Sequence, residues 1–421
     1  MPYVAAATRE NEPPMTCEIA VMNKYGVALA ADSAATFGRG QKVYQAAEKL
    51  FQISQSPPVG MMVSGAAELM DMPWEIVIKN YIQRADGRRF ERLEQYADDF
   101  FRFVEESAAL FPASLQETWF RESVRRYWKD TFLEPLAAKP GRRAKATPKR
   151  AALILSRTIA RENANWRQLP TLDLGADYGD KIITQYAAVL TELEKELFRP
   201  FDLPAGFAEK FRAAVRSMYM RSWFHPDDET GIVLAGMGET EPFPMLQEYQ
   251  VGTIAAGRLR FAKLGEARVT RDVSAIVAPF GVTEMVDIFY RGIQPALEDT
   301  LYEIIGRSLA HDQRHVRRKL TAAQIDKIVD QIRKSFTDEI VRKYQSPLIS
   351  AVEALPRQGL ATMAEALVNL TALKLRMSVE TLETVGGAIN VAVLSKGDGF
   401  IWIKRPNALR EAVASPVISA P

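Results

Sequence analysis

A threonine near the start of the chain has the sequence surroundings best suited to covalent chemistry. Thr16 is followed by Asp32, Lys49 and Gly65, each at or next to one terminus of a strand-like segment. A threonine hydroxyl becomes a nucleophile when a base takes its proton, and a free α-amine on the same residue can do so because its pKa is about 8. An ammonium held by a carboxylate, here Lys49 by Asp32, stabilises the negative charge that develops. The Gly65 N–H could donate to the oxyanion of an attacked carbonyl.

A first predicted β-hairpin brings Thr16 next to a carboxylate. The apolar segments 16–22 and 27–33 have strand length and flank a turn that ends in glycine. With the turn centred between the two segments, Thr16 lies beside Asp32 or Ser33, within a cross-strand distance of about 5 Å.

A second predicted hairpin positions the lysine in the same way. Segments 49–54 and 59–65 flank a proline-containing turn, and a turn centred near Pro57 places Lys49 opposite Ser64. Both hairpins therefore carry their polar residues at the end away from the turn. If the hairpins are neighbours, the two polar groups merge into one site.

The single cysteine of the chain, Cys17, offers a rival nucleophile. Alternation along a strand points its side chain to the face opposite Thr16, and it would need a free amine of its own. We therefore expect Cys17 to fill the core. A Ser-His-Asp mechanism has little support, since the three histidines lie far from this cluster in sequence, and metal-ligand spacing of His or Cys is absent.

The remaining segments predict an α+β protein, because blocks of strands alternate with blocks of helices. Further strands are expected at 231–236, 248–255, 274–278, 387–394 and 400–404, and helices at 66–82, 282–309, 321–344 and 362–378. The stretch 90–223 reads as several helices without a Gly/Ser linker around them. We interpret 16–421 as a single domain with helical insertions at about 90–223 and 300–360.

The overall composition is that of a globular protein with no nucleic-acid or membrane partner. The 421 residues include 54 Lys+Arg and 52 Asp+Glu, which give a net charge of +2, and 47% are hydrophobic. No apolar run is long enough for a membrane helix, and one cysteine cannot form an internal disulfide. These features favour the cytoplasm. Residues 1–15 lack an apolar signal core and are interpreted as a leader or a mis-assigned start.

The opening motif resembles proteasome β-subunits. Thr16 to Val21, then Gly26 to Ser33 and Thr36, are similar to the family's nucleophile strand and its G-V-hydrophobic-A-A-D-S-x-x-T strand, with the family spacing of 16 residues between Thr16 and Asp32. Segments 49–53 and 62–67 resemble the lysine strand and the S-G-x-A corner. Near the end, 386–391 is similar to the closing G-G-x-x-N hairpin.

The resemblance implies a role for each matching residue. Thr16 is the implied nucleophile, Asp32 and Lys49 its supporting pair, and Gly65 the oxyanion donor. In the same way, Thr36 and Ala67 would align an extended peptide through their backbones, and Val63 would line the first specificity pocket. No cofactor is implied.

The resemblance also implies a fold and an activity. The family is one of N-terminal-nucleophile hydrolases, whose fold is a four-layer αββα sandwich. We therefore expect a threonine peptidase that acts on peptides or proteins through an acyl-enzyme on Thr16, similar to the bacterial proteasome-like group Anbu. Such relatives form rings or spirals, so a homo-oligomer is implied. An unfoldase partner, the cleavage specificity and the subunit number stay open.

Several positions depart from the family pattern. The family's accessory serine before a glycine corresponds to Phe280, and its aspartate and serine ahead of the G-G pair fall at or near Leu382 and Val385. Glu380 and Glu383 are close by, and the spacing does not choose between them as substitutes.

Two alternatives to a peptidase stay open. The same nucleophile arrangement also hydrolyses small amides, which allows a non-peptidase amidase or acylase. A catalytically inactive assembly protein is the other, and it would keep residues 1–15 attached. Thr16 follows Met15, so translation from Met15 and removal of that methionine would expose Thr16 without autocleavage of a leader.

Overall fold

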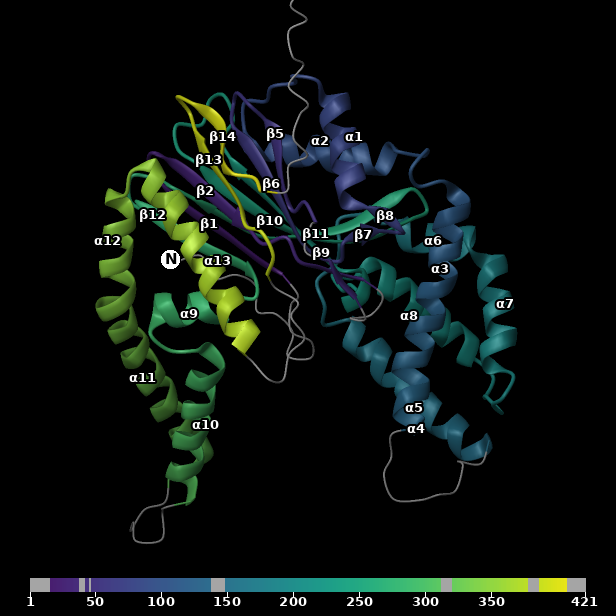
Figure 1. Ribbon diagram of the computed structural model, residues 1–421. Helices are drawn as coiled ribbons and strands as arrows, with labels where there is room; N and C mark the ends of the chain where they lie inside the picture. Colours follow the sequence, from purple (N-terminus) through teal and green to yellow (C-terminus); the bar gives the residue numbers. More distant parts are fainter. Residues whose placement is uncertain are drawn as a thin grey trace, which may run out of the picture.

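The computed structural model describes residues 16–37, 42–44, 47–137, 148–311, 320–377 and 386–406. The described part combines antiparallel sheets with many helices, which confirms the predicted α+β class. Two sheets lie in the middle of the molecule, and helices surround them (Figure 1). The predicted leader, residues 1–15, lies outside the described residues.

The first sheet carries the strand that begins next to Thr16. All its neighbouring strands are antiparallel. Its strand order is β12 (Ala275–Gly281), β1 (Cys17–Asn23), β2 (Gly26–Ala31), β13 (Asn390–Ser395) and β14 (Gly399–Lys404). The central position of β1 and β2 explains why both strands are completely buried and so rich in small apolar residues.

The second sheet carries the lysine hairpin at one edge. Its strand order is β11 (Arg258–Arg268), β10 (Met245–Ala255), β9 (Thr230–Gly236), β6 (Val59–Gly65) and β5 (Leu50–Ser54). Two short ribbons complete the strands, β3 (Ala35–Phe37) with β4 (Lys42–Tyr44), and β7 (Glu68–Leu69) with β8 (Met72–Pro73).

The two sheets pack against each other through one shared apolar core. Ala20 and Leu29 of the first sheet belong to the same buried cluster as Met62, Val233 and Leu246 of the second. Along each strand these residues alternate with residues that face the covering helices, because successive side chains of a strand point to opposite faces of the sheet. The inward faces of β1 and β6 are therefore directed toward each other.

Helices cover the outer face of each sheet. Helix α13 (Arg357–Met377) packs on β1, β2 and β13, and α12 (Ser346–Ala354) packs beside it on β12 and β1. On the second sheet, α1 (Trp74–Ala85) and α2 (Leu93–Glu106) share a buried cluster with Val63, Leu234 and Tyr249. Figure 1 shows α13 and α1 on opposite sides of the strands.

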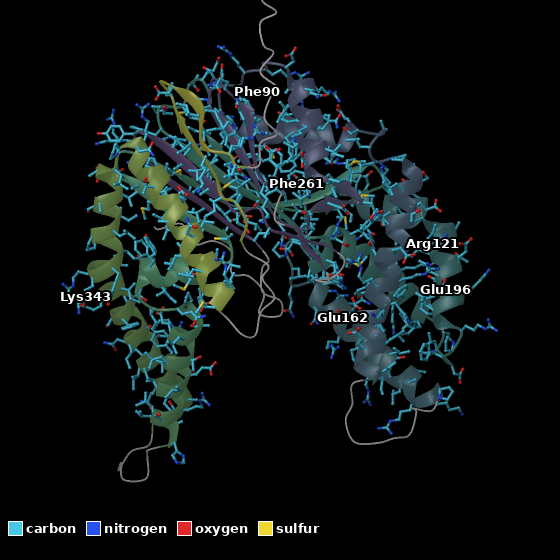
Figure 2. All side chains as sticks on the ribbon, viewed as in Figure 1. Phe90, Arg121, Glu162, Glu196, Phe261 and Lys343 are labelled. Atoms are coloured by element: carbon cyan, nitrogen blue, oxygen red, sulfur yellow. The ribbon has the colours of Figure 1, made fainter. Side chains whose placement is uncertain are left out.

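A first helical region extends from the second sheet and has an aromatic core of its own. It comprises α3 (Ala113–Trp128), a π-helical turn (Lys129–Leu133), α4 (Glu134–Ala137), α5 (Pro148–Trp166), α6 (Tyr178–Gln185), α7 (Ala187–Phe198) and α8 (Phe207–Met220). Trp128 and Phe211 are buried in this core with rings 5.5 Å apart. On its surface, Arg125 of α3 pairs with Glu196 of α7 at 2.7 Å (Glu196 is labelled in Figure 2).

A second helical region projects beside the first sheet. It comprises α9 (Glu284–Arg291), α10 (Pro295–His311), α11 (Ala322–Ile340) and α12, joined to α11 by a π-helical turn (Val341–Gln345) in which Lys343 is labelled (Figure 2). The predicted single helix 282–309 is therefore wrong, since it is split into α9 and α10. Gly292 has a φ of +73°, a left-handed conformation that ends α9.

Two further sequence expectations need correction. Strand β11 was not expected, because its many charged side chains hide the alternation of an exposed edge strand. The helix expected from residue 66 begins only at Trp74. Met70 and Asp71 have φ angles of 51° and 63°, and these left-handed residues form the turn between β7 and β8 instead of a first helical turn.

The two hairpin registers differ in how well the sequence anticipates them. In the first hairpin, Glu18 pairs with Ala31, as the predicted turn centre requires. In the second, the predicted pairing of Lys49 with Ser64 is wrong by one residue, because the Val63 N–H donates to the Lys49 carbonyl at 2.9 Å. A register shift between Gln52 and Ser54 accounts for the difference, since a β-bulge adds one residue to that strand.

Candidate active site

Thr16 immediately precedes β1 and is almost completely covered. Its carbonyl accepts a hydrogen bond from the Val282 N–H at 2.8 Å, and the whole residue is 3% exposed. Gly281 makes this close approach possible. A Cβ at Gly281 would lie 2.2 Å from the Thr16 carbonyl oxygen and 2.9 Å from its hydroxyl oxygen, so only glycine fits beside Thr16 there.

Asp32 and Lys49 form a buried ion pair next to the start of β1. The Lys49 ammonium lies 2.7 Å from Asp32 Oδ1, and both residues are buried. Three backbone N–H groups also donate to the Asp32 carboxylate, from Cys17 at 3.2 Å, Ala34 at 3.3 Å and Gly386 at 2.9 Å. These donors fix the carboxylate and stabilise its negative charge, so that it can hold the lysine in one place.

Glu18 links Thr16 to this ion pair, although no sequence motif singled it out as a site residue. The Thr16 hydroxyl donates to Glu18 Oε2 at 3.1 Å, and Glu18 Oε1 lies 3.7 Å from the Lys49 ammonium. Strand alternation was the available signal, because residues 16 and 18 share a face. The same alternation places Glu18 with Ala20 and Met22 on the side that faces the second sheet.

The surroundings of Glu18 disfavour its negative charge. The residue is 0% exposed, and its β12 neighbour is the buried ring of Phe280. Its Oε1 accepts no hydrogen bond from any described residue. Burial raises the pKa of Glu18 to about 8, against the opposing attraction of Lys49 and with a further contribution from the Asp32 charge. One lysine therefore faces two carboxylates, and the burial of Glu18 favours the neutral form of its side chain.

Cys17 lies on the other face of β1, as the alternation predicted. It is completely buried in the cluster that β1 forms with α13, together with Val368 and Ala364. Burial raises the pKa of the Cys17 thiol, which disfavours the reactive thiolate. The geometry confirms the expectation that Cys17 is a core residue.

The other predicted site residues lie along β6 and β3. Gly65 ends β6 with a φ of +80°, and a Cβ there would lie 2.5 Å from the Glu229 carbonyl oxygen. Val63 packs beneath α1, on the face of β6 opposite Met62. The Ala67 carbonyl accepts from the Trp74 N–H at 3.1 Å, and Thr36 pairs with Val43 of β4. Their roles toward a substrate stay predictions.

The departures from the family pattern are placed only in part. Phe280 occupies the end of β12 and packs in the core between the sheets, opposite Glu18. The region of Leu382, Val385, Glu380 and Glu383 lies outside the described residues.

The described residues contain no group of three or more His, Cys, Asp or Glu side chains arranged to hold a metal ion. Among the described helices, none is both long and apolar enough to cross a membrane.

Comparisons with known proteins give structural neighbours only. No protein-family model and no curated protein matches the chain. Among solved structures, it is similar to a Gly-1 mutant of Anbu from Hyphomicrobium sp. strain MC1, with 10% identity and a TM-score of 0.29, over 92% of this chain and 85% of that chain. The Anbu structure from the same strain has 9% identity and a TM-score of 0.28, over 93% of this chain and 88% of that chain.

A third neighbour is Anbu (ancestral beta-subunit) from Yersinia bercovieri, with 10% identity and a TM-score of 0.27, over 93% of this chain and 89% of that chain. At such identities and TM-scores these neighbours carry no inference about activity, which we draw from the residues of this chain.

Proposed function

We propose that the chain is a threonine-type N-terminal-nucleophile hydrolase that cleaves peptide bonds through Thr16. The observation that carries this proposal is the contact series from the Thr16 hydroxyl through Glu18 to Lys49, which Asp32 holds at 2.7 Å. A buried hydroxyl next to an ammonium and two carboxylates has the means to lose its proton and to stabilise an oxyanion.

The proposed reaction proceeds through an ester. Thr16 Oγ1 bonds to the amide carbonyl carbon, the C–N bond breaks, and the amine leaves with the proton that the hydroxyl gave up. Water then cleaves the ester, which restores the hydroxyl and releases the carboxylic acid. Gly65 serves as an oxyanion donor, while Thr36 and Ala67 align the peptide and Val63 contributes to the first specificity pocket.

The active form in this proposal begins at Thr16. With 3% of the residue exposed, the hydroxyl is closed to a bulky substrate until the residues around it rearrange. Removal of residues 1–15 would also create a free α-amine next to the hydroxyl, with a pKa of about 8 that suits a base. The two face-to-face sheets with helices outside them support the four-layer N-terminal-nucleophile sandwich as the fold of this enzyme.

Assembly into a homo-oligomer is the remaining part of the proposal. Leu297, Leu301 and Ile304 leave an exposed apolar row on α10, at helical spacing. Such a row supports contacts between copies of the chain.

A threonine-directed β-lactone tests the proposed nucleophile. We expect one adduct of the purified protein on Thr16, located by peptide mass mapping, and no adduct in Thr16→Ala at matched fold stability. Intact-mass measurement of the same sample identifies the mature N-terminus. An adduct on another residue, or none at all, would refute the assignment of Thr16.

Labelled peptides and acylated small molecules then separate the peptidase from an amidase. Turnover of peptides that disappears in Thr16→Ala supports the peptidase. Turnover of acylated small molecules alone would replace it with an amidase. A protein that keeps residues 1–15 and turns over neither would be the inactive assembly protein.

A further inference from the structure

The side chain that contacts the Thr16 hydroxyl is a carboxylate, and this geometry adds a base to the site. Glu18 Oε2 accepts from the hydroxyl at 3.1 Å, within the range for direct proton transfer. Its second oxygen, Oε1, accepts no hydrogen bond from the described residues although it is fully buried. A buried carboxylate with one hydrogen bond and one ion pair at 3.7 Å is incompletely solvated, which favours uptake of a proton.

We propose that Glu18 is a catalytic residue which accepts the Thr16 hydroxyl proton during attack and returns it to the leaving amine. The inference rests on the proposed function, because it assigns a role in that reaction. The proton moves from Thr16 Oγ1 to Glu18 Oε2 as the C–O bond forms, and from Glu18 to the nitrogen as the C–N bond breaks. Protons and charges balance without any further reactant.

The neighbours of Glu18 suit a carboxylate that changes its protonation state during a reaction. Lys49, at 3.7 Å from Oε1, stabilises the ionised form, whereas Asp32 and the apolar ring of Phe280 favour the neutral form. On β2 the facing residue is Ala31, which is not titratable. The opposing influences hold the two forms close in free energy near neutral pH, as a general base requires.

Glu18 also differs in function from Asp32. Asp32 receives four N–H donors, including Lys49, and is therefore held in one position. Among the described residues, Glu18 receives the Thr16 hydroxyl and the more distant Lys49 ammonium. The first carboxylate is fixed to position Lys49, and the second is free to take a proton.

The test compares β-lactone acylation of Thr16 in the wild type and in Glu18→Gln across about pH 6 to 9.5, with the adduct located by mass mapping. Gln has the shape of protonated Glu, so the fold is retained, which thermal melting checks. We expect little difference near pH 6, where Glu18 is mostly protonated. As the pH rises, the ratio of the wild-type acylation rate to that of the variant should increase by up to tenfold per pH unit, to about 10²-fold above pH 8.

The outcomes separate the inference from the proposed function. Equal rates at every pH, or a variant slower by the same factor throughout, would overturn the role of Glu18 as base while Thr16 remains the nucleophile. A wild type without any Thr16 adduct would overturn both. If Glu18→Gln does not fold, two other measurements decide. A wild-type acylation rate that stays constant below pH 8 would overturn the inference. Glu18→Asp, which keeps the charge but shortens the side chain, must show a rise of the acylation rate with pH at a lower absolute rate.

Discussion

Two buried cations among the described residues have very different surroundings, Lys49 between the sheets and Arg260 beneath the first helical region. Arg260, on β11, is 5% exposed and donates to the carbonyls of Met218 and Trp223, both at 2.7 Å, and of Tyr219 at 3.1 Å. Its guanidinium also lies 5.0 Å from the centre of the Tyr219 ring. Because the Met218 and Tyr219 carbonyls lie in the last turn of α8, Arg260 neutralises a helix C-terminus.

The surroundings of Lys49 are incomplete in comparison. Lys49 forms ion pairs with two carboxylates, those of Asp32 and Glu18. One oxygen of Glu18 accepts no hydrogen bond among the described residues. A buried charge whose partners are all backbone carbonyls anchors the fold. A buried charge next to an unsatisfied carboxylate and a hydroxyl is a candidate for chemistry. Arg260 therefore contributes to stability, whereas Lys49 is a candidate for function.

The largest expected effect on stability comes from removing the Arg260 charge. Arg260→Met leaves the Met218, Tyr219 and Trp223 carbonyls buried without their donor, so we expect a loss of about 3–5 kcal/mol in the free energy of unfolding, measured by urea titration. The Thr16 acylation rate of the folded protein should not change. Lys49→Met is the matched variant, and it should lower that rate by more than about 10²-fold. Equal effects of the two variants on rate would erase the distinction.

A smaller effect is expected in the pH dependence of stability. The pKa of Glu18 is 4.5 in the unfolded chain and about 8 in the folded one, so between these values the folded state keeps a proton that the unfolded state has lost. The associated stability is complete below pH 4.5 and is lost as the pH rises to about 8, at up to about 1.4 kcal/mol per unit.

Glu18→Gln removes this titration. We expect its free energy of unfolding to fall less than that of the wild type between about pH 5.5 and pH 8, by roughly 3 kcal/mol. Urea unfolding at several pH values measures the difference. Parallel curves for the two proteins would mean that Glu18 titrates normally and that the site resembles the Arg260 region more closely than we infer.

The smallest effect is expected at Cys17, the side chain adjacent to the nucleophile on the opposite face of β1. Cys17→Ala should cost about 1 kcal/mol of stability through lost packing under α13 and leave β-lactone acylation of Thr16 unchanged. Mass mapping of the adduct and a thermal melt measure the two quantities. Loss of the adduct in this variant would move the reactive centre to the other side of the strand.

Local patterns in the sequence were sufficient for the first half of the site. Alternation along β1 placed Thr16 and Cys17 on opposite faces, and the short turn fixed the register that brings Asp32 next to the start of β1. Both follow from the geometry of one hairpin, in which few residues separate the partners. The same period of two also contained the position of Glu18, although a carboxylate within a buried strand is uncommon enough to be overlooked.

The rest was decided by tertiary packing. Lys49 belongs to another hairpin, and it reaches Asp32 because two sheets stack face to face, an arrangement that no short-range pattern specifies. The bulge that shifted its register and the charged strand that carries Arg260 depend likewise on long-range contacts. The sequence alone thus determined which residues could react. The packing of the two sheets determined which of them meet, because burial and the orientation of charges arise only between distant segments.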